Sequence, residues 1–151
     1  GIVAHPVALT AQNLHPIDGA TFGFVAMDAG EAKRLAVEKL EALQIPVVDV
    51  GMGLELVDGT LGGILRTTIS TPGKRDHLRA RVSFAEHDAP NVYSSNIQVA
   101  DLNALNAVMA IIKWKKLRGF YRDLEKEHHS TYTTDGNMLL NGDTPECSSN
   151  N

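Results

Sequence analysis

The 151 residues carry a formal net charge of −4, with 43% hydrophobic and 21% charged side chains. A chain of this length folds as one domain with a substantial core. The acidic balance argues against a nucleic-acid-binding protein, which needs surplus Lys and Arg on one face, and no apolar run approaches the roughly 20 residues that span a membrane.

The chain begins in strand-like sequence. Gly1 is followed by Ile-Val-Ala without an initiating Met, so we expect this start to be a cut into a longer sequence. Thr10 can cap a short helical turn over residues 11–14, and residues 15–19 are expected to form a connection. The apolar run at residues 22–27 is typical of a buried parallel strand.

Residues 31–43 are predicted to form an amphipathic helix, because their apolar residues recur at spacings of three and four. These apolar residues are Ala32, Leu35, Ala36, Leu40 and Leu43. Residues 45–50 form the next predicted strand, with Pro46 near its start, where a missing N–H is tolerated. A strand, a helix and a strand in this order predict a right-handed parallel βαβ unit.

A β-hairpin is predicted after this unit. Residues 54–57 and 62–71 flank Asp58-Gly59, and both of these turn residues can adopt positive φ. Residues 79–84 are expected to add another strand. Residues 86–95, rich in Asp, Asn, Pro and Ser, are expected to form a mobile loop.

The longest predicted helix begins near residue 96 or 97 and ends at Leu117 or as far on as Glu127. It is apolar nearly all round, so we expect it to contact the sheet on one side and a second subunit or a missing part of the domain on the other. Turn signals at Asp135-Gly136 and Asn141-Gly142 precede a flexible tail at residues 144–151. The sequence thus predicts an α/β fold for residues 1–143, with a Rossmann-like, mostly parallel sheet, an antiparallel hairpin and a long C-terminal helix.

Asp28 is the leading candidate site residue, because it lies where the strand at residues 22–27 gives way to the helix. Open α/β sheets bind ligands at the carboxyl ends of their strands. A carboxylate at this position can also cap the helix and meet the positive end of its dipole, and the two roles are compatible. No glycine-rich phosphate loop precedes the strand.

These segments together resemble the second half of the ThiF-type adenylyltransferase fold, from the superfamily that includes ubiquitin-activating enzymes and the activators of sulfur-carrier proteins. Residues 22–28 and the following Ala29-Gly-Glu-Ala-Lys-Arg34 resemble the family's apolar strand that ends in Asp-Asn-x-x-x-Arg. Residues 45–53 resemble the strand behind it, residues 54–71 the hairpin that follows, and residues 96–114 the long C-terminal helix of prokaryotic members.

The resemblance implies an ATP-dependent enzyme that activates the C-terminal carboxylate of a small ubiquitin-like or sulfur-carrier protein. Asp28 would be the catalytic residue that holds Mg²⁺ and ATP, with Lys33, Gly51 and Gly53 also at the nucleotide. Lys33 stands where the family usually has Arg, and Ala29 where it usually has Asn. The family's glycine loop, and the arginine and lysine that reach the phosphates, lie upstream of Gly1. We therefore expect this polypeptide alone not to complete an adenylation.

Two other functions stay open. One is a non-catalytic dimeric binding or scaffold module with a Rossmann-like fold, in which the long apolar helix forms the dimer interface. The other is an NAD-dependent dehydrogenase, but Gly51-Met-Gly53 is an incomplete dinucleotide fingerprint, with Leu56 at the third glycine position and a hairpin after it. We interpret the two glycines as a tight turn that lets the backbone pass close to a ligand or a neighbouring strand.

Three further motifs have both a functional and a structural interpretation. His77, Glu127 and the adjacent His128-His129 could bind a metal, but we favour surface histidines or a helix C-terminal cap. Cys147 could be a thioester-forming nucleophile, but its polar tail lacks the basic, sheltered setting that activates a thiol. A basic cluster is interpreted as a solvated helix face, and its members are Lys113, Lys115, Lys116, Arg118 and Arg122.

The single cysteine cannot form an intrachain disulfide, and the first residues lack the basic start and long apolar centre of a signal peptide. We therefore expect a reducing, cytoplasmic location. The expected partners are ATP, Mg²⁺, the carrier protein and a second copy of the chain in a homodimer, with no nucleic acid and no membrane.

Overall fold

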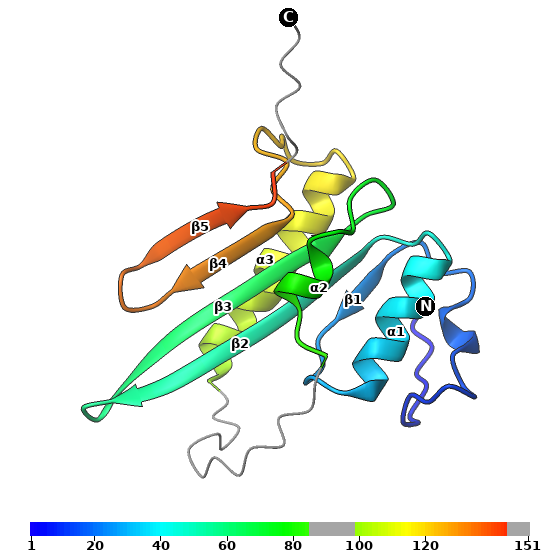
Figure 1. Ribbon diagram of the computed structural model, residues 1–151, viewed down its shortest axis with the longest axis horizontal. Coiled ribbons are helices and arrows are strands. Elements are labelled where there is room, and N and C mark those ends of the chain that lie inside the picture. Colours follow the sequence, from blue (N-terminus) through cyan, green and yellow to red (C-terminus); the bar gives the residue numbers. More distant parts are fainter. Residues whose placement is uncertain (85–98, 145–151) are drawn as a thin grey trace, which may run out of the picture.

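The computed structural model describes residues 1–84 and 99–144, which form a five-stranded mixed sheet with helices on both faces (Figure 1). The strand order across the sheet follows the chain, from β1 (Gly23–Val25) through β2 (Val47–Val57), β3 (Thr60–Ser70) and β4 (His129–Thr133) to β5 (Met138–Gly142). Helix α3 (Ala100–Leu117) covers one face, whereas α1 (Glu31–Ala42) and the short α2 (Leu78–Arg81) lie on the other.

The parallel strand–helix–strand order of the predicted βαβ unit is confirmed, but its first strand is shorter than expected and is not buried throughout, since Phe24 is 53% exposed. β1 pairs in parallel with β2, in register from Gly23 opposite Val47 to Val25 opposite Asp49, and α1 connects the two strands. The helix begins at the predicted residue and ends one residue before the predicted end. Because β2 continues from Asp49 to Val57 beyond the end of β1, a ledge of sheet extends past the carboxyl end of β1.

The predicted hairpin is also confirmed. β2 and β3 pair antiparallel from Val47 opposite Ser70 to Val57 opposite Thr60. Asp58 and Gly59 form the turn with φ values of 50° and 79°, the positive values that this residue pair favours. Gly51 and Gly53 lie inside β2, so the interpretation of these glycines as a tight turn is wrong and the strands expected at residues 45–50 and 54–57 are one strand.

The expected mostly parallel sheet is wrong, since in residues 1–84 and 99–144 only β1 and β2 pair in parallel. The sequence-based expectation missed β4 and β5, which pair antiparallel with each other at one edge of the sheet. Both strands are five residues long and lack a regular alternation of apolar and polar residues, so the turn signals around them dominated the prediction. Asn141-Gly142, predicted as a turn, instead belongs to β5.

Two helical predictions also need correction. α3 ends at Leu117, where Arg118 and Gly119 turn the chain with a φ of 72° at the glycine, so this helix does not reach Glu127. Two strands follow α3, which is therefore long but not C-terminal in the described chain, and its expected start at residue 96 or 97 lies outside the described residues. The strand expected at residues 79–84 is wrong, because helix α2 occupies the first part of it.

Alternating side chains of the sheet build two apolar layers, because neighbours in a strand point to opposite faces. The layer under α1 and α2 comprises Val25, Val37, Leu40, Ile45, Val47, Leu78 and Val82. On the other face, Val48 and Ile69 pack against Ala110 of α3. Val47 and Val48 thus belong to different layers, and residues two positions apart in β2 share a face.

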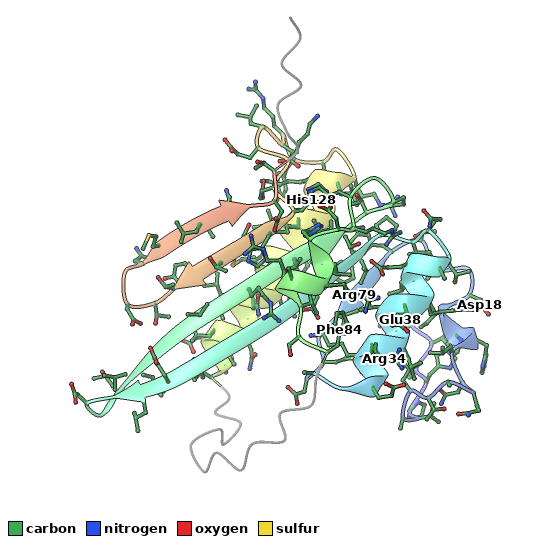
Figure 2. The ribbon with its side chains drawn as sticks, viewed as in Figure 1. Asp18, Arg34, Glu38, Arg79, Phe84 and His128 are labelled. Carbon is green, nitrogen blue, oxygen red and sulfur yellow. The ribbon has the colours of Figure 1, made fainter. Side chains whose placement is uncertain are left out.

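Ion pairs lie along the outer surface of α1, and two of them link the helix to neighbouring segments (Figure 2). Arg34 lies 2.8 Å from Glu38, and Arg79 of α2 lies 3.6 Å from the same carboxylate with its guanidinium 5.1 Å from the centre of the Phe84 ring. Asp18 pairs with Lys39 at 2.7 Å. Such exposed pairs are screened by solvent and contribute little, so the buried side of α1 supplies most of its attachment to the sheet.

The mobile loop expected at residues 86–95, Cys147 and positions 145–151 of the expected tail lie outside the described residues. In the part of the chain that the structure describes, no helix has both the length and the apolar character needed to cross a membrane.

Candidate functional site

A cavity of about 620 Å³ opens on the α1 face of the sheet, beside the carboxyl end of β1. Its lining includes all four residues to which the sequence analysis gave a role, namely Asp28, Lys33, Gly51 and Gly53. The rest of the lining consists of Met27, Ala29, Met52, Ile64, Arg66, Ser83 and Thr131. The volume falls in the range of roughly 300–1,000 Å³ that is typical of small-molecule sites.

Asp28 lies on the rim of this cavity, three residues after β1 and three before α1. The N-terminal cap of α1 is Gly30, and no side chain caps the helix, so Asp28 does not act as its cap. Its carboxylate is exposed and has no hydrogen bond or ion pair to any residue that the structure describes. A second cavity of about 490 Å³, between the start of α1 and residues 9–11, also contacts Asp28. The carboxylate is therefore available to a ligand.

Lys33 projects from α1 onto β2, where its ammonium group meets Asp49. The Nζ atom lies 2.6 Å from Asp49 Oδ1, and the two side chains are 3% and 1% exposed. A buried carboxylate needs a paired cation to remain charged at low free-energy cost. Lys33 thus lines the cavity, but its positive charge is neutralised by Asp49.

Arg66 is the second cation beside Asp49. It sits on β3 directly opposite Gly51, and its Nη2 atom lies 3.4 Å from Asp49 Oδ2. The guanidinium crosses β2 over Gly51, where an added Cβ atom would lie 2.8 Å from Arg66 Cζ. At Gly53 an added Cβ would meet no atom within 4 Å. Gly51 therefore makes room for Arg66, whereas Gly53 leaves open space above the strand.

The electrostatics of the site depend on Asp49. Burial raises the pKa of this carboxyl, and the neighbouring Lys33 and Arg66 act in the opposite direction. Lys33, Arg66 and Asp49 together carry one net positive charge. Arg66 is farther from Asp49 than Lys33 is, so the charge of Arg66 is less fully neutralised. The cavity is thus lined by the positive guanidinium of Arg66 and has the negative carboxylate of Asp28 on its rim.

Sequence reasoning missed Asp49 and Arg66. A usable signal existed for Asp49, because it is the one charged residue in the apolar strand sequence at residues 45–50, and charged side chains are rarely buried without partners. Arg66 gave no such signal, since its relation to Asp49 depends on the pairing of β2 with β3 across 17 positions of sequence.

The histidines have structural roles that the surface interpretation did not foresee. His129 belongs to β4 and is buried, with its Nδ1 atom 2.9 Å from Thr68 Oγ1. His77 is buried too, and its Nε2 atom lies 2.9 Å from the carbonyl oxygen of Ile69. Across the described ranges 1–84 and 99–144, no group of three or more His, Cys, Asp or Glu side chains could hold a metal.

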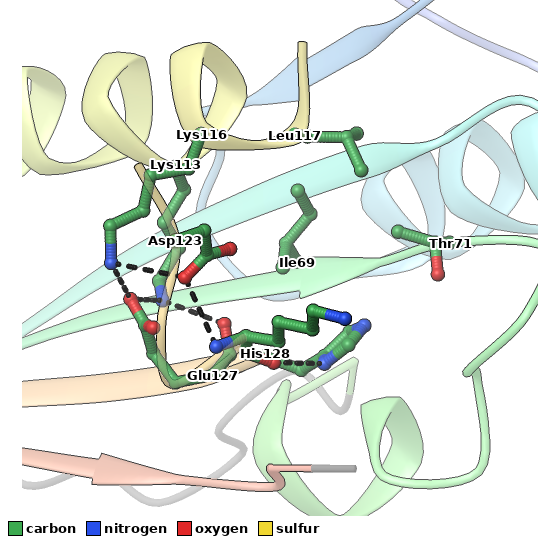
Figure 3. Close-up of a pocket in the computed structure, with 9 residues that line it drawn as sticks. Ile69, Thr71, Lys113, Lys116, Leu117, Asp123, Glu127 and His128 are labelled. Carbon is green, nitrogen blue, oxygen red and sulfur yellow. Dashed lines mark hydrogen bonds and ion pairs between the residues drawn. The ribbon is translucent and has the colours of Figure 1, made fainter. Parts of the chain in front are cut away.

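The basic cluster at the end of α3 is partly buried as well, so its interpretation as a solvated helix face is wrong for Lys113. The Lys113 ammonium donates hydrogen bonds to the backbone carbonyl and Oε1 of Glu127, both at 3.2 Å, and Lys116 donates to the same Oε1 at 2.8 Å. Figure 3 shows these side chains around a separate cavity of about 360 Å³, with Asp123 beside them. Three lysines and two carboxylates line this cavity, and the ion pairs of Lys113 and Lys116 with Glu127 and of Lys116 with Asp123 anchor the segment after α3 to the helix.

The larger cavity has the chemistry for an anionic ligand that carries a cation, because Asp28 offers oxygen ligands and Arg66 offers N–H donors. In comparisons with known proteins, no family model matches the chain and no curated protein sequence matches it. The functional argument therefore starts from this cavity.

Proposed function

We propose that this chain supplies one wall of the nucleotide site in a ThiF-type, ATP-dependent adenylyltransferase. The observation that carries the proposal is a convergence. Asp28, Lys33, Gly51 and Gly53, which the sequence resemblance assigns to one nucleotide, lie on the loop after β1, on α1 and on β2, and they line a single cavity. The cavity is also at the carboxyl end of the one parallel strand pair in the described chain, the position at which α/β sheets bind ligands.

The residues present fit Mg²⁺ and ATP. Proteins bind Mg²⁺ through one or two carboxylates and leave the other positions to phosphates and water. Asp28 is such a carboxylate, and Arg66 places positive charge in the same cavity. Mg²⁺ bound with ATP would offset phosphate charge while an acceptor carboxylate forms a bond to the α-phosphorus and the bond to pyrophosphate breaks.

The other residues would position these groups. Lys33 holds Asp49, and Asp49 holds Arg66 over Gly51. Gly53 leaves space for a ligand close to the backbone of β2. As the acceptor we propose the C-terminal carboxylate of a small ubiquitin-like or sulfur-carrier protein in the cytoplasm, with the family resemblance as the support.

The test is calorimetric titration of Mg-ATP into the full chain and into Asp28→Asn. Loss of one charge-assisted contact corresponds to about 1.5–3 kcal/mol, so we expect Asp28→Asn to bind Mg-ATP roughly 10- to 100-fold more weakly. ATP without Mg²⁺ should bind both proteins alike. Asp58→Asn is the matched control, because it removes an exposed carboxylate at the hairpin tip, where Asn also tolerates the positive φ. Equal affinities of Asp28→Asn and the unchanged chain would contradict the proposal, and binding of NAD in place of Mg-ATP would favour a dehydrogenase.

A non-catalytic dimeric scaffold is the second candidate, and the surface of α3 favours it. Leu105, Val108 and Ile112 form an apolar stripe at helical spacing on its outward side, and Val108 is 50% exposed. Contiguous exposed apolar residues mark interaction surfaces. Sedimentation of the chain should then show a dimer that Val108→Glu dissociates. A monomer at all concentrations would remove this candidate and the proposed homodimer.

A further inference from the structure

We infer that Arg66 is the residue that binds an oxyanion of the ligand in the larger cavity, and that buried Asp49 is a positioning residue for it. The oxyanion can come from two sources, a phosphate group of the nucleotide or the carboxylate of the acceptor. This inference rests on the proposed function, because it assigns a ligand group to the same cavity. It adds a binding residue that neither the strand-end position nor the family resemblance points to.

The first support is the way in which the sheet prepares Arg66. Gly51 stands opposite Arg66 in the β2–β3 register, and its lack of a side chain lets the guanidinium lie across β2. Asp49, two positions earlier on the same face, contacts one end of the guanidinium at 3.4 Å. Arginine keeps its charge and its planar set of donors at any ordinary pH. The guanidinium is thereby held in one orientation before a ligand binds.

The second support is unused binding capacity. Lys33 is 0.8 Å closer to Asp49 than Arg66 is, since the two distances are 2.6 Å and 3.4 Å. Asp49 therefore neutralises Lys33 more fully than it neutralises Arg66. The Nε–H group of Arg66 is buried and has no acceptor among the residues of the described chain, but the side chain as a whole is 28% exposed. Arginine binds carboxylate and phosphate oxygens through its planar set of N–H donors, so the exposed part of the guanidinium can still bind a ligand oxyanion.

The third support is the complementary charge and space around Arg66. Gly53, the next residue of β2 on the same face, leaves the adjacent volume empty. Asp28 lies on the rim of the same cavity as the opposite charge. A metal-bound phosphate would place its metal at Asp28 and its oxygens at Arg66, whereas a carboxylate ligand would use Arg66 alone.

The experiment titrates two probes into the full chain and follows them by calorimetry, with Mg-pyrophosphate for the phosphate source and N-acetylglycine for the carboxylate source. We expect at least one probe to bind, and Arg66→Gln to weaken that probe at least about tenfold, the loss of one charged hydrogen-bonded contact. Arg66→Lys should retain part of the affinity, because lysine keeps the positive charge but lacks the planar set of N–H donors. Arg118→Gln is the matched control, since Arg118 is exposed and does not line the cavity.

The outcomes separate this inference from the proposed function. If Arg66→Gln binds both probes as tightly as the unchanged chain, or if neither probe binds the unchanged chain, Arg66 is not the oxyanion-binding residue. If Asp28→Asn weakens Mg-ATP while Arg66→Gln does not, the adenylation proposal stands and this inference fails. If Arg66→Gln weakens the probes while Asp28→Asn leaves Mg-ATP unaffected, the inference stands and the metal role fails.

A second variant tests the positioning role even if Arg66→Gln does not fold. Gly51→Ala places a methyl group where the guanidinium lies, whereas Gly53→Ala places it in open space. We expect the NMR signal of the Arg66 Nε–H group to shift in the free Gly51→Ala protein and its probe affinity to fall several-fold. Gly53→Ala should leave the free-protein signal in place. An unshifted signal in both variants would overturn the assignment of Gly51 as the residue that makes room for the Arg66 guanidinium.

Discussion

Removal of the Lys33 ammonium should destabilise the fold more than any exposed ion pair can. In Lys33→Met, Asp49 keeps its burial but loses the cation at 2.6 Å, and only Arg66 at 3.4 Å remains beside it. Breaking one side of a buried pair lowers the free energy of unfolding by about 3–5 kcal/mol, and the remaining Arg66 places the expected loss near 3 kcal/mol. At roughly 2–4 °C per kcal/mol, the melting temperature should fall by about 6–12 °C.

Lys39→Met is the matched control, because it makes the same substitution in the same helix at a solvent-exposed pair. Lys39 and Asp18 are 29% and 54% exposed at a similar distance of 2.7 Å, so their loss should lower the free energy of unfolding by at most about 1 kcal/mol. Urea unfolding at neutral pH, followed by circular dichroism, measures both variants. Equal losses in the two variants would refute the claim that burial makes the Lys33–Asp49 pair important.

The same variant has a defined pH dependence. Burial raises the pKa of folded Asp49 above its ordinary value, and loss of Lys33 removes a neighbour that opposes this increase. Between the pKa of Asp49 in the unfolded chain and its raised pKa in the folded state, the folded state binds a proton that the unfolded chain has already lost. The free energy of unfolding therefore falls as pH rises through this range. The difference in free energy of unfolding between Lys33→Met and the unchanged chain should therefore become smaller on acidification toward about pH 5. A difference that does not change with pH would count against an ionised, buried Asp49.

The remaining predictions concern other parts of the chain. Burial, with help from the charge of Arg81, lowers the pKa of His129 to about 4, so the free energy of unfolding should fall as pH drops from about 6.5 to 4, and His129→Gln should flatten that slope in urea unfolding. Lys113→Met should lower the free energy of unfolding by about 2–3 kcal/mol, because its buried carboxylate partner keeps only one other cation, whereas Lys115→Met should change it by less than about 1 kcal/mol. Gly51→Ala should lower it by about 1–3 kcal/mol through overpacking, while Gly53→Ala should change it by less than about 1 kcal/mol, and a larger loss at Gly53 would contradict the open space above β2.

The sequence predicted the elements whose local signals agree with their tertiary contacts. The apolar spacing in residues 31–43 and the Asp58-Gly59 turn each specify one structure, and both predictions are confirmed. β4 and β5 escaped prediction because their pairing partners, not their own residues, make them strands. The parallel sheet was overestimated for a related reason, since a single βαβ unit does not indicate how the following strands pair.

Only the part of the candidate site that depends on local sequence could be predicted. Asp28 follows from its place at the end of an apolar run, and the structure puts it on the cavity. Asp49 and Arg66 depend on the register of two strands and on the absence of a side chain at Gly51. Long-range pairing of this kind is not encoded in the spacing of nearby residues, so it emerges only once the hairpin is built.

Paramagnetic replacement of the metal tests the central claim most directly. Mn²⁺ supplied with ATP to the full chain should broaden the amide NMR signals of Asp28, Gly51 and Gly53, which line one cavity, and leave that of Gly59 at the hairpin tip sharp. In Asp28→Asn the broadening at the cavity should disappear. Broadening centred on another part of the chain, or the same cavity broadening in Asp28→Asn, would contradict the proposed role of Asp28 as the metal ligand of a nucleotide site.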